Sequence, residues 1–440
     1  MEKFFKFSER STNLKTEIVA GIATFLTMAY IIVVNPNILS IGGMSFSGVL
    51  FATVLVSAIS SILMGLWANL PFALAPGMGI NAFFTFSLVK GMGVEWQTAL
   101  GAVFISGIVF IILSVTKVRT LILKAIPASL RYAVAAGIGL FLTLIGLKSV
   151  GFIVPSEATL VTFGGINVNT VIFLIGLLVT AFFVMKKWKG ALIFGVIFTS
   201  VLTLIVSLIG VSAGLLETPL VTAPQTIFAA PSLDVFFKVD IISALSVSMI
   251  APIFSLLFID MFDSISTFLG VAHAAGLVDS EGQPVNVDKA LEVDAVATTL
   301  SGLFGTSSAT TYIESAAGVE EGGKTGLTAI VTGLCFLPFM FLSPLLSFIP
   351  SVATAPILVI IGTFMMKPLA NLDWKNMEEV LPAFLALILI PLTYSITQGI
   401  IWGFIFYTLI KLLLGKYKEI SPMLYIIDAF AILSLILPLL

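Results

Sequence analysis

Residues 254–268 read FSLLFIDMFDSISTF, a stretch in which two aspartates interrupt sequence apolar enough for a membrane interior. Asp260 and Asp263 are three positions apart, so they share one face of a helix, which Ser264 and Thr267 extend. A carboxylate in a membrane-spanning helix is costly and normally faces a cavity, a partner or a substrate path. Hydrogen bonds that only pack the helix against its neighbours are the alternative. We favour a binding or proton-handling site.

The composition predicts an α-helical membrane protein. Of the 440 residues, 59% are hydrophobic and 10% are charged, and the mean hydropathy is +1.16. Apolar runs of roughly 20 residues, the length that crosses a bilayer as a helix, follow one another with short loops, a pattern unlike that of a β-barrel. The single Cys335 and single His273 exclude a disulfide framework and a metal site built from several cysteines or histidines. We expect no cofactor and no metal.

The apolar runs predict fourteen membrane spans. Eighteen of the 21 lysines and arginines fall on one face of this arrangement, and only Lys90, Lys148 and Lys238 fall on the other. The positive-inside rule then predicts a cytoplasmic N-terminus. Residues 1–15 are expected to form a short helix on the inner surface, while 421–440 either cross the membrane or lie along it. The predicted spans are 17–39, 46–70, 72–90, 95–116, 128–149, 168–186, 190–212, 240–271, 290–306, 308–319, 325–347, 352–369, 380–396 and 397–415.

Short sequence echoes in the same order predict that the two halves are repeats. Spans 4, 5 and 7 resemble spans 11, 12 and 14, through TALGAV at 98–103 and TGLTAI at 325–330, IPAS at 126–129 and IPSV at 349–352, and GVIF at 195–198 and GFIF at 403–406. Because seven is odd, two seven-span halves lie in opposite orientations, as in many secondary transporters. The predicted fold class is an all-α polytopic membrane protein, with fourteen transmembrane spans in a 7+7 inverted repeat.

Spans 3 and 10 are predicted to be broken. Residues 75–82 read APGMGINA, in which one proline and two glycines disfavour a helix, and residues 306–314 read TSSATTYIE, whose β-branched residues favour extended chain. Each is expected to form a short extended segment followed by a half-helix, with residues 80–82 matching 313–315. Non-helical backbone at membrane depth is tolerated where it is buried or lines a cavity, so these segments predict the binding site.

Glu314 is the third acid that the sequence places in this region, and no lysine or arginine lies near mid-depth in these spans. Unpaired carboxylates at low dielectric can exchange protons or accept hydrogen bonds from a ligand rich in N–H groups. For Asn81, a structural bridge between the broken spans is as good an interpretation as ligand contact. The rings of Tyr30 and Tyr312 could contact a flat substrate, although ordinary packing is the better expectation.

Four motifs carry a resemblance to a known family. They are TFLTMAYII at 24–32 followed by Asn35-Pro36, APGMGINAFF at 75–84, the pair Asp260 and Asp263, and TYIESAAG at 311–318. Over essentially the whole chain, they resemble the adenine-guanine-hypoxanthine permease branch of the nucleobase–ascorbate (nucleobase:cation symporter-2) family. The resemblance implies a core domain in residues 1–125 and 240–348. It also implies a gate domain, in 126–239 and 349–440, that mediates dimerisation and elevator-like movement of the core.

The resemblance also implies the function and the site. We expect import of guanine and hypoxanthine, with adenine weaker, by proton symport across the cytoplasmic membrane, in a homodimer without catalytic activity or a nucleic-acid partner. Asp263, Asn81 and Thr310 are expected to support the site or carry the proton. The residues expected to contact the purine are Asp260, Glu314, Ala29, Tyr30, Gly79, Ile80, Tyr312 and Ile313.

Three alternatives were weighed against this expectation. Sodium coupling stays open, because the carboxylates and the carbonyl oxygens of unwound backbone can bind Na⁺ as readily as the carboxylates can bind a proton. An anion transporter on the same fold is disfavoured, because its site should contain a cation or bare helix N-termini rather than three acids. An intramembrane enzyme is disfavoured because the sequence offers neither a nucleophile–base pair nor a metal cluster.

Overall fold

The computed structural model describes residues 2–116, 125–221, 224, 226–278 and 285–436. Its helices in chain order are α1 (Glu2–Phe5), α2 (Leu14–Met28), α3 (Ile31–Ile41), α4 (Phe46–Leu63), α5 (Met78–Ala82), α6 (Trp96–Val115), α8 (Ala128–Ser149), α9 (Val168–Met185), α10 (Ala191–Ser212), α11 (Ile241–Ala244), α12 (Ile250–Ala275), α13 (Val287–Phe304), α14 (Ser315–Glu320), α15 (Gly326–Phe336), α16 (Ser343–Ser347), α17 (Ser351–Met365), α18 (Met377–Thr393), α19 (Ile396–Leu413) and α20 (Pro422–Ile436). The strands are β1 (Leu74–Pro76), β2 (Ile153–Ser156), β3 (Leu160–Phe163) and β4 (Ala309–Thr311). π-helices cover Met64–Ala68 and Phe83–Gly91, and 3₁₀ turns cover Val247–Met249, Leu337–Phe341, Lys367–Asn371 and Tyr417–Glu419.

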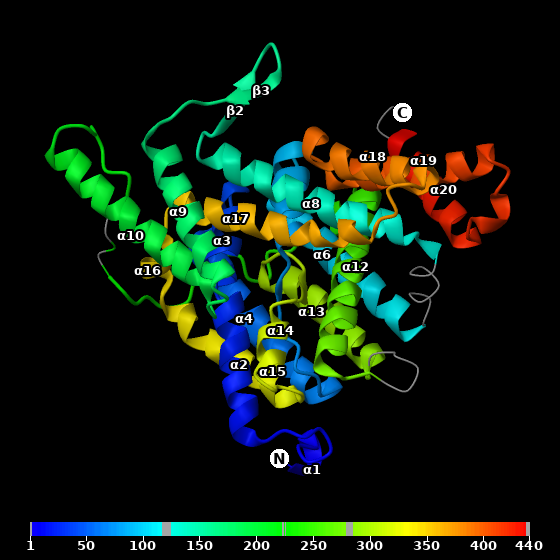
Figure 1. Cartoon of the computed structure of the whole chain (residues 1–440), viewed down its shortest axis with the longest axis horizontal. Helices are drawn as coiled ribbons and strands as arrows, with labels where there is room; N and C mark the ends of the chain where they lie inside the picture. The colour runs from blue at the N-terminus through cyan, green and yellow to red at the C-terminus, as the bar shows by residue number, and fades with distance from the viewer. Residues whose placement is uncertain (1, 117–124, 222–223, 225, 279–284, 437–440) are drawn as a thin grey trace.

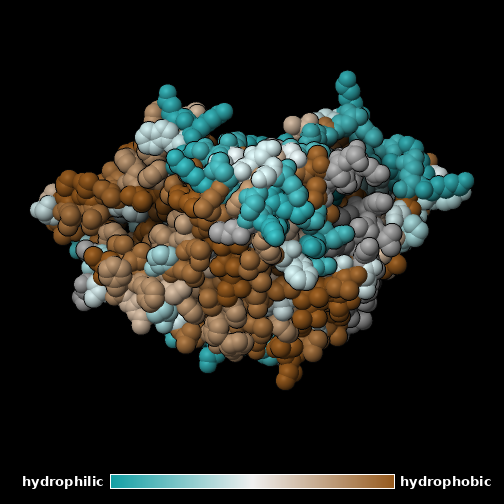
Figure 2. Space-filling model, turned by 90° about the horizontal axis from the view of Figure 1, so that it is seen from below, coloured by the Kyte–Doolittle hydropathy of each residue, from teal (hydrophilic) through white to brown (hydrophobic). Residues whose placement is uncertain are grey.

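The helices are those of a multi-pass membrane protein. Nine of the helical stretches in the described residues are long and apolar enough to cross a bilayer. Large apolar side chains on the outer helices are exposed, among them Leu178 on α9 at 70% and Leu208 on α10 at 64%. Figure 2 shows hydrophobic residues spread over a broad part of one face, with hydrophilic residues gathered toward its upper edge. The count of fourteen spans and the cytoplasmic N-terminus stay predictions.

Several predicted spans are divided into shorter pieces. Span 3 consists of β1, α5 and the π-helix 83–91, and span 10 consists of β4 and α14. Predicted span 11 is divided into α15, a 3₁₀ turn and α16, with Pro338 and Pro344 at the starts of the last two pieces. Proline lacks the N–H that a continuous helix needs, so the chain re-forms its hydrogen bonds at these points.

The extended segments predicted in spans 3 and 10 are confirmed, and they pair with each other. β1 and β4 are antiparallel, with Leu74 opposite Thr311, Ala75 opposite Thr310 and Pro76 opposite Ala309. A second antiparallel pair, β2 with β3, follows α8 and was not predicted. It projects from the top of the molecule in Figure 1, and its β3 residues are exposed.

The helices form two groups that pack mainly within themselves. The first helix group contains α2–α6 and α12–α15, with close packing of α13 on α6 and of α15 on α2 and α4. The second helix group contains α8–α10 and α17–α19, in which α8 lies against both α17 and α18. Figure 1 shows α2 and α15 in the lower part of the view and α8, α17 and α18 across the upper part. The predicted core and gate boundaries stay predictions.

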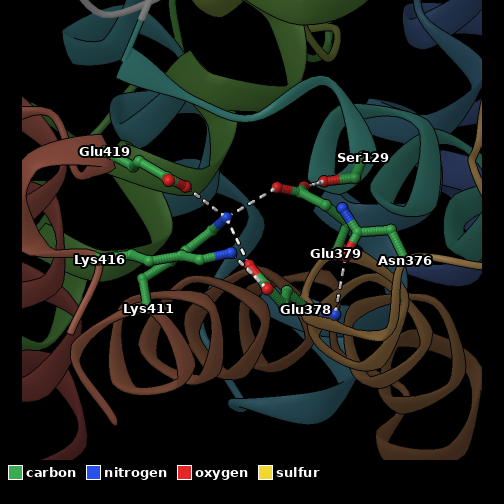
Figure 3. Close-up of polar contacts among 7 residues, drawn as sticks. All are labelled: Ser129, Asn376, Glu378, Glu379, Lys411, Lys416 and Glu419. Atoms are coloured by element: carbon green, nitrogen blue, oxygen red, sulfur yellow. Dashed lines mark hydrogen bonds and ion pairs between the residues drawn. The ribbon is translucent and has the colours of Figure 1, made fainter. Parts of the chain in front are cut away.

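A buried lysine joins the ends of three helices in the second helix group (Figure 3). Lys411 of α19 is 4% exposed, and its Nζ lies 3.0 Å from a Glu378 oxygen at the start of α18 and 2.8 Å from a Glu419 oxygen after α19. Glu379 completes the ring, 3.6 Å from the same ammonium, and accepts a hydrogen bond from Ser129 of α8. These contacts compensate the cost of burying the ammonium.

The two chain ends show how the terminal segments are held. The short helix expected over 1–15 is limited to α1, because Lys6 and Ser11 adopt positive φ angles and turn the chain. Arg10 then donates to the carbonyl oxygens of Asn69 and Lys324, each at 2.6 Å.

At the other end, α20 packs on α19 and α12. Its 15 residues rise about 22 Å, less than the roughly 30 Å of a bilayer interior. Residues 437–440 lie outside the described residues.

Candidate functional site

The paired strands β1 and β4 bring the two broken spans together in the interior of the first helix group. All six of their residues are buried. Beyond the strands, Gly77 N donates to Ser308 O and Tyr312 N donates to Ala73 O, both at 2.9 Å. Each extended segment therefore satisfies the backbone groups of the other, which is the condition for non-helical chain at membrane depth.

The half-helices begin at different distances from their strands. After β1, α5 begins at Met78 with Gly77 as its N-cap, whereas after β4 the residues Tyr312 and Ile313 intervene and Glu314 is the N-cap of α14. Counted from the start of each half-helix, Glu314 has the position that Gly77 has in the other half, whereas the rough match from the sequence placed residues 313–315 against 80–82. The difference arises because the link after β4 is longer than the link after β1.

The first span is also irregular beside this site. α2 ends at Met28 and α3 begins at Ile31, with Ala29 and Tyr30 between them. Ile32 N donates to Ala29 O and Val33 N donates to Tyr30 O, at 3.2 and 3.1 Å, which is the tighter i→i−3 pattern of a 3₁₀ turn. This turn aims the Tyr30 side chain at the start of α14, where its hydroxyl meets Glu314.

Asp260 of α12 is buried against the link that precedes β4. Its Oδ2 accepts hydrogen bonds from the hydroxyls of Thr298 on α13 and of Ser308, the latter at 2.6 Å. Its Oδ1 is buried and has no hydrogen-bond partner among the described residues. A buried carboxylate oxygen without a donor is costly, so this oxygen is a candidate acceptor for a proton or a ligand.

Glu314 is held in place by Tyr30. The Tyr30 hydroxyl donates to Glu314 Oε1 at 2.7 Å. Glu314 and Asp263 are half-buried, and their carboxylates are close enough for mutual repulsion. The Tyr30 side chain is thus buried, and it contacts the glutamate through its hydroxyl.

Asp294 belongs to the same acidic cluster, and the sequence analysis missed it. It is fully buried on α13, where Oδ1 accepts from Thr311 Oγ1 at 3.4 Å and Oδ2 has no hydrogen-bond partner among the described residues. Its carboxylate lies within electrostatic reach of Asp260. A signal was present in the sequence, since Asp294, Thr298 and Ser301 follow the i, i+4, i+7 spacing of one helix face.

The remaining predicted polar residues support the backbone of the site. Asn81 accepts a hydrogen bond from Ser307, which favours the structural bridge over ligand contact. Thr310 pairs with Ser264 of α12 at 2.7 Å between hydroxyl oxygens. The Tyr312 hydroxyl donates to the carbonyl oxygen of Pro76 at 2.6 Å. Ser264 thus joins the polar face predicted for α12, although its partner is β4 rather than a ligand.

The site is open on the side of Ile313. Ile313 is 61% exposed, and the neighbouring Glu314 is half-buried. Ala29 and Ile80 are buried, and Gly79 is so close to α8 that a Cβ built on it would lie 2.7 Å from Ile138 Cγ2. The structure therefore brings together the predicted acids and Tyr30. Gly79 lies instead at the contact between the two helix groups, and the neighbouring Ile80 is buried.

The acidic cluster consists of Asp260, Asp263, Asp294 and Glu314. Among the described residues, none of these carboxylates forms an ion pair with a lysine or arginine, although Arg131 of α8 lies 6.0 Å from the ring of Phe262. His273, at the end of α12, is exposed. The site is thus acidic and lacks a fixed counter-cation in this part of the chain.

Known proteins show to which family this arrangement belongs. A family model described as the Permease family matches residues 15–401. The putative permease MJ0326 of Methanocaldococcus jannaschii is 44% identical over 97% of this chain and 96% of its own length. The adenine permease AdeP of Escherichia coli is 38% identical over 99% and 96% of the two chains. The guanine/hypoxanthine permease PbuO of Bacillus subtilis is 41% identical over 98% and 99%.

Solved structures support the fold independently of close sequence similarity. The transmembrane domain of the cyanobacterial bicarbonate transporter BicA superposes with a TM-score of 0.64 at 15% identity, covering 89% of this chain and 97% of that one. The murine anion transporter Slc26a9 in its inward-facing state gives 0.63 at 10% identity, covering 92% and 69%. With sequence relatives that match nearly end to end, the chain belongs to the nucleobase–ascorbate (nucleobase:cation symporter-2) family of permeases, in the branch of adenine, guanine and hypoxanthine permeases.

Proposed function

We propose that this permease imports purine nucleobases together with a proton and that the acidic cluster is where both bind. The observation that carries the proposal is the pair of acceptors at the broken spans, Glu314 oriented by Tyr30 and Asp260 with a buried oxygen that lacks a donor. A purine is a neutral ligand with several N–H donors, which such a site can satisfy. The names of relatives that match nearly the whole chain support the same substrate class.

The pairing with Glu314 favours 6-oxopurines. Guanine presents N1–H beside its 2-amino group, and hypoxanthine keeps the N1–H, so an ionised carboxylate accepts from either base. Tyr30 occupies one acceptor position of Oε1. A carboxylate has about four such positions, so room for a bidentate contact remains.

A proton can be carried by the buried aspartates. A proton that neutralises one of two buried carboxylates at low dielectric relieves their repulsion, and Asp260 and Asp294 are both fully buried within electrostatic reach of each other. Each also has an oxygen without a hydrogen-bond partner among the described residues. Asp263, half-buried beside Glu314, is the third group through which a proton could pass between the cluster and water.

Transport follows if the first helix group moves as a core domain along the second, which acts as the gate domain. The packing of the helices mainly within each group supports such a movement. The open side of the site at Ile313 corresponds to an inward-open state, given a cytoplasmic N-terminus. The exposed apolar faces of α9 and α10 are available to lipid or to the gate domain of a second copy.

Of two alternatives, one has a specific observation in its favour. The orphan oxygens of Asp260 and Asp294 could bind Na⁺, so sodium coupling is the second candidate. The solved structures with this fold are described as bicarbonate and anion transporters. At 10 to 15% identity they indicate the fold alone, and an acidic cluster repels an anion.

The test is uptake of radiolabelled hypoxanthine into proteoliposomes that hold the purified protein. Proton symport of a neutral base carries one positive charge, so an inside-negative potential from potassium and valinomycin should drive uptake at equal pH and without sodium. Each 100 mV contributes about 2.3 kcal/mol to accumulation. If only a sodium gradient restores uptake, Na⁺ and not a proton is the coupling ion. Uptake of bicarbonate in place of purine would overturn the substrate class.

A further inference from the structure

A large cavity with a basic rim lies apart from the acidic cluster. Its volume is about 930 Å³, and it lies between the two helix groups. The first helix group contributes the end of α3 and the π-helix 83–91, including Phe86, Ser87 and Lys90. The second contributes the end of α8 with Lys148 and the junction of α18 and α19 around Tyr394. The cavity lining includes none of the four carboxylates of the acidic cluster.

The position of the cavity suits the outer end of a substrate path. Lys90 and Lys148 lie in the last turns of their helices, on the face that the charge pattern assigns to the outside. Phe83, which is fully buried, lines the cavity two residues beyond Asn81. The cavity thus lies on the same broken span as the acidic site and is separated from it by buried side chains.

Its charge is opposite to that of the acidic cluster. Two of the three basic residues assigned to the outer face line this one cavity, and its described lining includes no aspartate or glutamate. A lysine at a helix C-terminus is explained by the helix dipole alone. Two lysines from different helix groups that converge on one cavity, with a Tyr394 ring beneath one of them, are not explained in that way.

Aromatic and hydroxyl groups complete the lining. Lys148 Nζ lies 4.9 Å from the centre of the Tyr394 ring, and the Phe86 ring meets that ring edge to face at 6.2 Å. Ser87 donates to the Tyr394 carbonyl oxygen at 3.2 Å, which links the two helix groups. Such a cavity offers ring faces for a planar ligand and ammonium donors for its acceptor atoms.

We propose that this cavity is an entry subsite that selects planar bases bearing a carbonyl next to a ring nitrogen, the 6-oxopurines, before they reach the acidic cluster. The inference rests on the proposed function. A lysine donates well to the O6 and N7 acceptors of guanine and hypoxanthine, whereas adenine has an amino donor in place of O6. The lysines thus select at entry for the same bases that Glu314 favours at the central site, through the O6 and N7 edge of the ring rather than the N1 edge.

The first test is cysteine labelling. In a Cys335→Ala background, Ser149→Cys places one thiol at the cavity, and intact cells are treated from outside with anionic or cationic methanethiosulfonates of similar size. Because Ser149 is exposed beside Lys148, we expect the anionic reagent to react several-fold faster, and the combined substitutions Lys90→Gln and Lys148→Gln to remove the difference. Hypoxanthine should slow the labelling and adenine should not. A thiol that is unreactive from outside, or equal protection by both bases, overturns the proposal.

The second test separates the subsite from the function. Lys148→Gln and Lys90→Gln should raise the KM for hypoxanthine by about tenfold and that for adenine by less than twofold, as expected for a lost charged hydrogen bond. Lys238→Gln, the third outer-face lysine and not part of the cavity, is the matched control. If the wild type is active and the variants leave the ratio of the two KM values unchanged, the subsite proposal is overturned, while purine transport stands.

If the wild type takes up no purine, the proposed function fails. Protection of the Ser149→Cys thiol by hypoxanthine then still decides whether the subsite exists.

Discussion

Tyr30 and Glu314, which are 284 positions apart in the sequence, are joined by a hydrogen bond of 2.7 Å from the phenol to Oε1. The tyrosine lies in the tight turn between α2 and α3, and the glutamate caps α14. Two irregular points of two different spans are therefore held together through one carboxylate. This carboxylate is the proposed purine acceptor. The Tyr30 hydroxyl orients it, although Tyr30 itself need not touch the substrate.

Tyr30→Phe should weaken purine binding without unfolding the protein. Removing the hydroxyl deletes one hydrogen bond to a charged group, about 1.5–3 kcal/mol, so we expect the KM for hypoxanthine to rise by roughly 10- to 100-fold. Tyr425→Phe, at an exposed residue of α20, is the matched control and should behave as wild type. Uptake kinetics in proteoliposomes provide the measurement. A Tyr30→Phe variant with wild-type KM would show that Glu314 needs no such positioning.

Asp260→Asn and Glu314→Gln should each abolish uptake while leaving membrane insertion and folding intact. The amides keep the shape of the carboxylates but cannot ionise, and removing a buried charge should not lower stability because the charge itself is costly. Uptake and detergent-solution melting curves are to be compared for each variant. Normal uptake by both variants would remove the acidic cluster from the transport site.

Asp294→Asn should separate binding from coupling. Asp294 does not contact the open side of the site, and its charge acts on Asp260 from the neighbouring helix. Without the second negative charge, protonation of Asp260 is less favoured, so we expect exchange of hypoxanthine to continue while accumulation driven by a membrane potential is lost. Counterflow and potential-driven uptake, measured in the same vesicles, distinguish the two. Intact potential-driven accumulation would assign the proton to another group.

The sequence predicted the parts of this site that depend on local structure. The shared face of Asp260 and Asp263 follows from helical periodicity, and the extended segments follow from the prolines, glycines and threonines of residues 75–82 and 306–314. Asp294 was missed because Asp288 and Glu292 precede it, which makes the start of α13 look like a solvated polar turn. Its burial arises when α6 and β4 pack on that helix, and such tertiary contacts are not visible in the local sequence pattern.

Lys411→Met should destabilise the second helix group. The substitution keeps the length of the buried stem but leaves Glu378, Glu379 and Glu419 without their shared cation. Breaking a buried ion pair costs about 3–5 kcal/mol, and the partial exposure of these carboxylates reduces that, so we expect a fall of several degrees in Tm. Lys418→Met, at an exposed lysine, is the control. An unchanged Tm would mean that water replaces the ammonium without cost.

The preference among purines should reveal the ionisation of Glu314. Adenine presents an N1 acceptor where guanine and hypoxanthine present N1–H, and that acceptor is repelled by an ionised carboxylate. A buried group left unpaired costs about 1–3 kcal/mol, so excess adenine should compete with labelled hypoxanthine at pH 7 roughly 5- to 100-fold less well than guanine does. Uracil should be weaker still, because one ring leaves part of a purine-sized site unfilled. Glu314→Gln offers both an amide donor and an acceptor, which match N1 and the 6-amino group of adenine, so the residual binding of that variant should shift toward adenine. Competition by adenine equal to that by guanine in the wild type would overturn the ionised pairing, while leaving purine transport as the function.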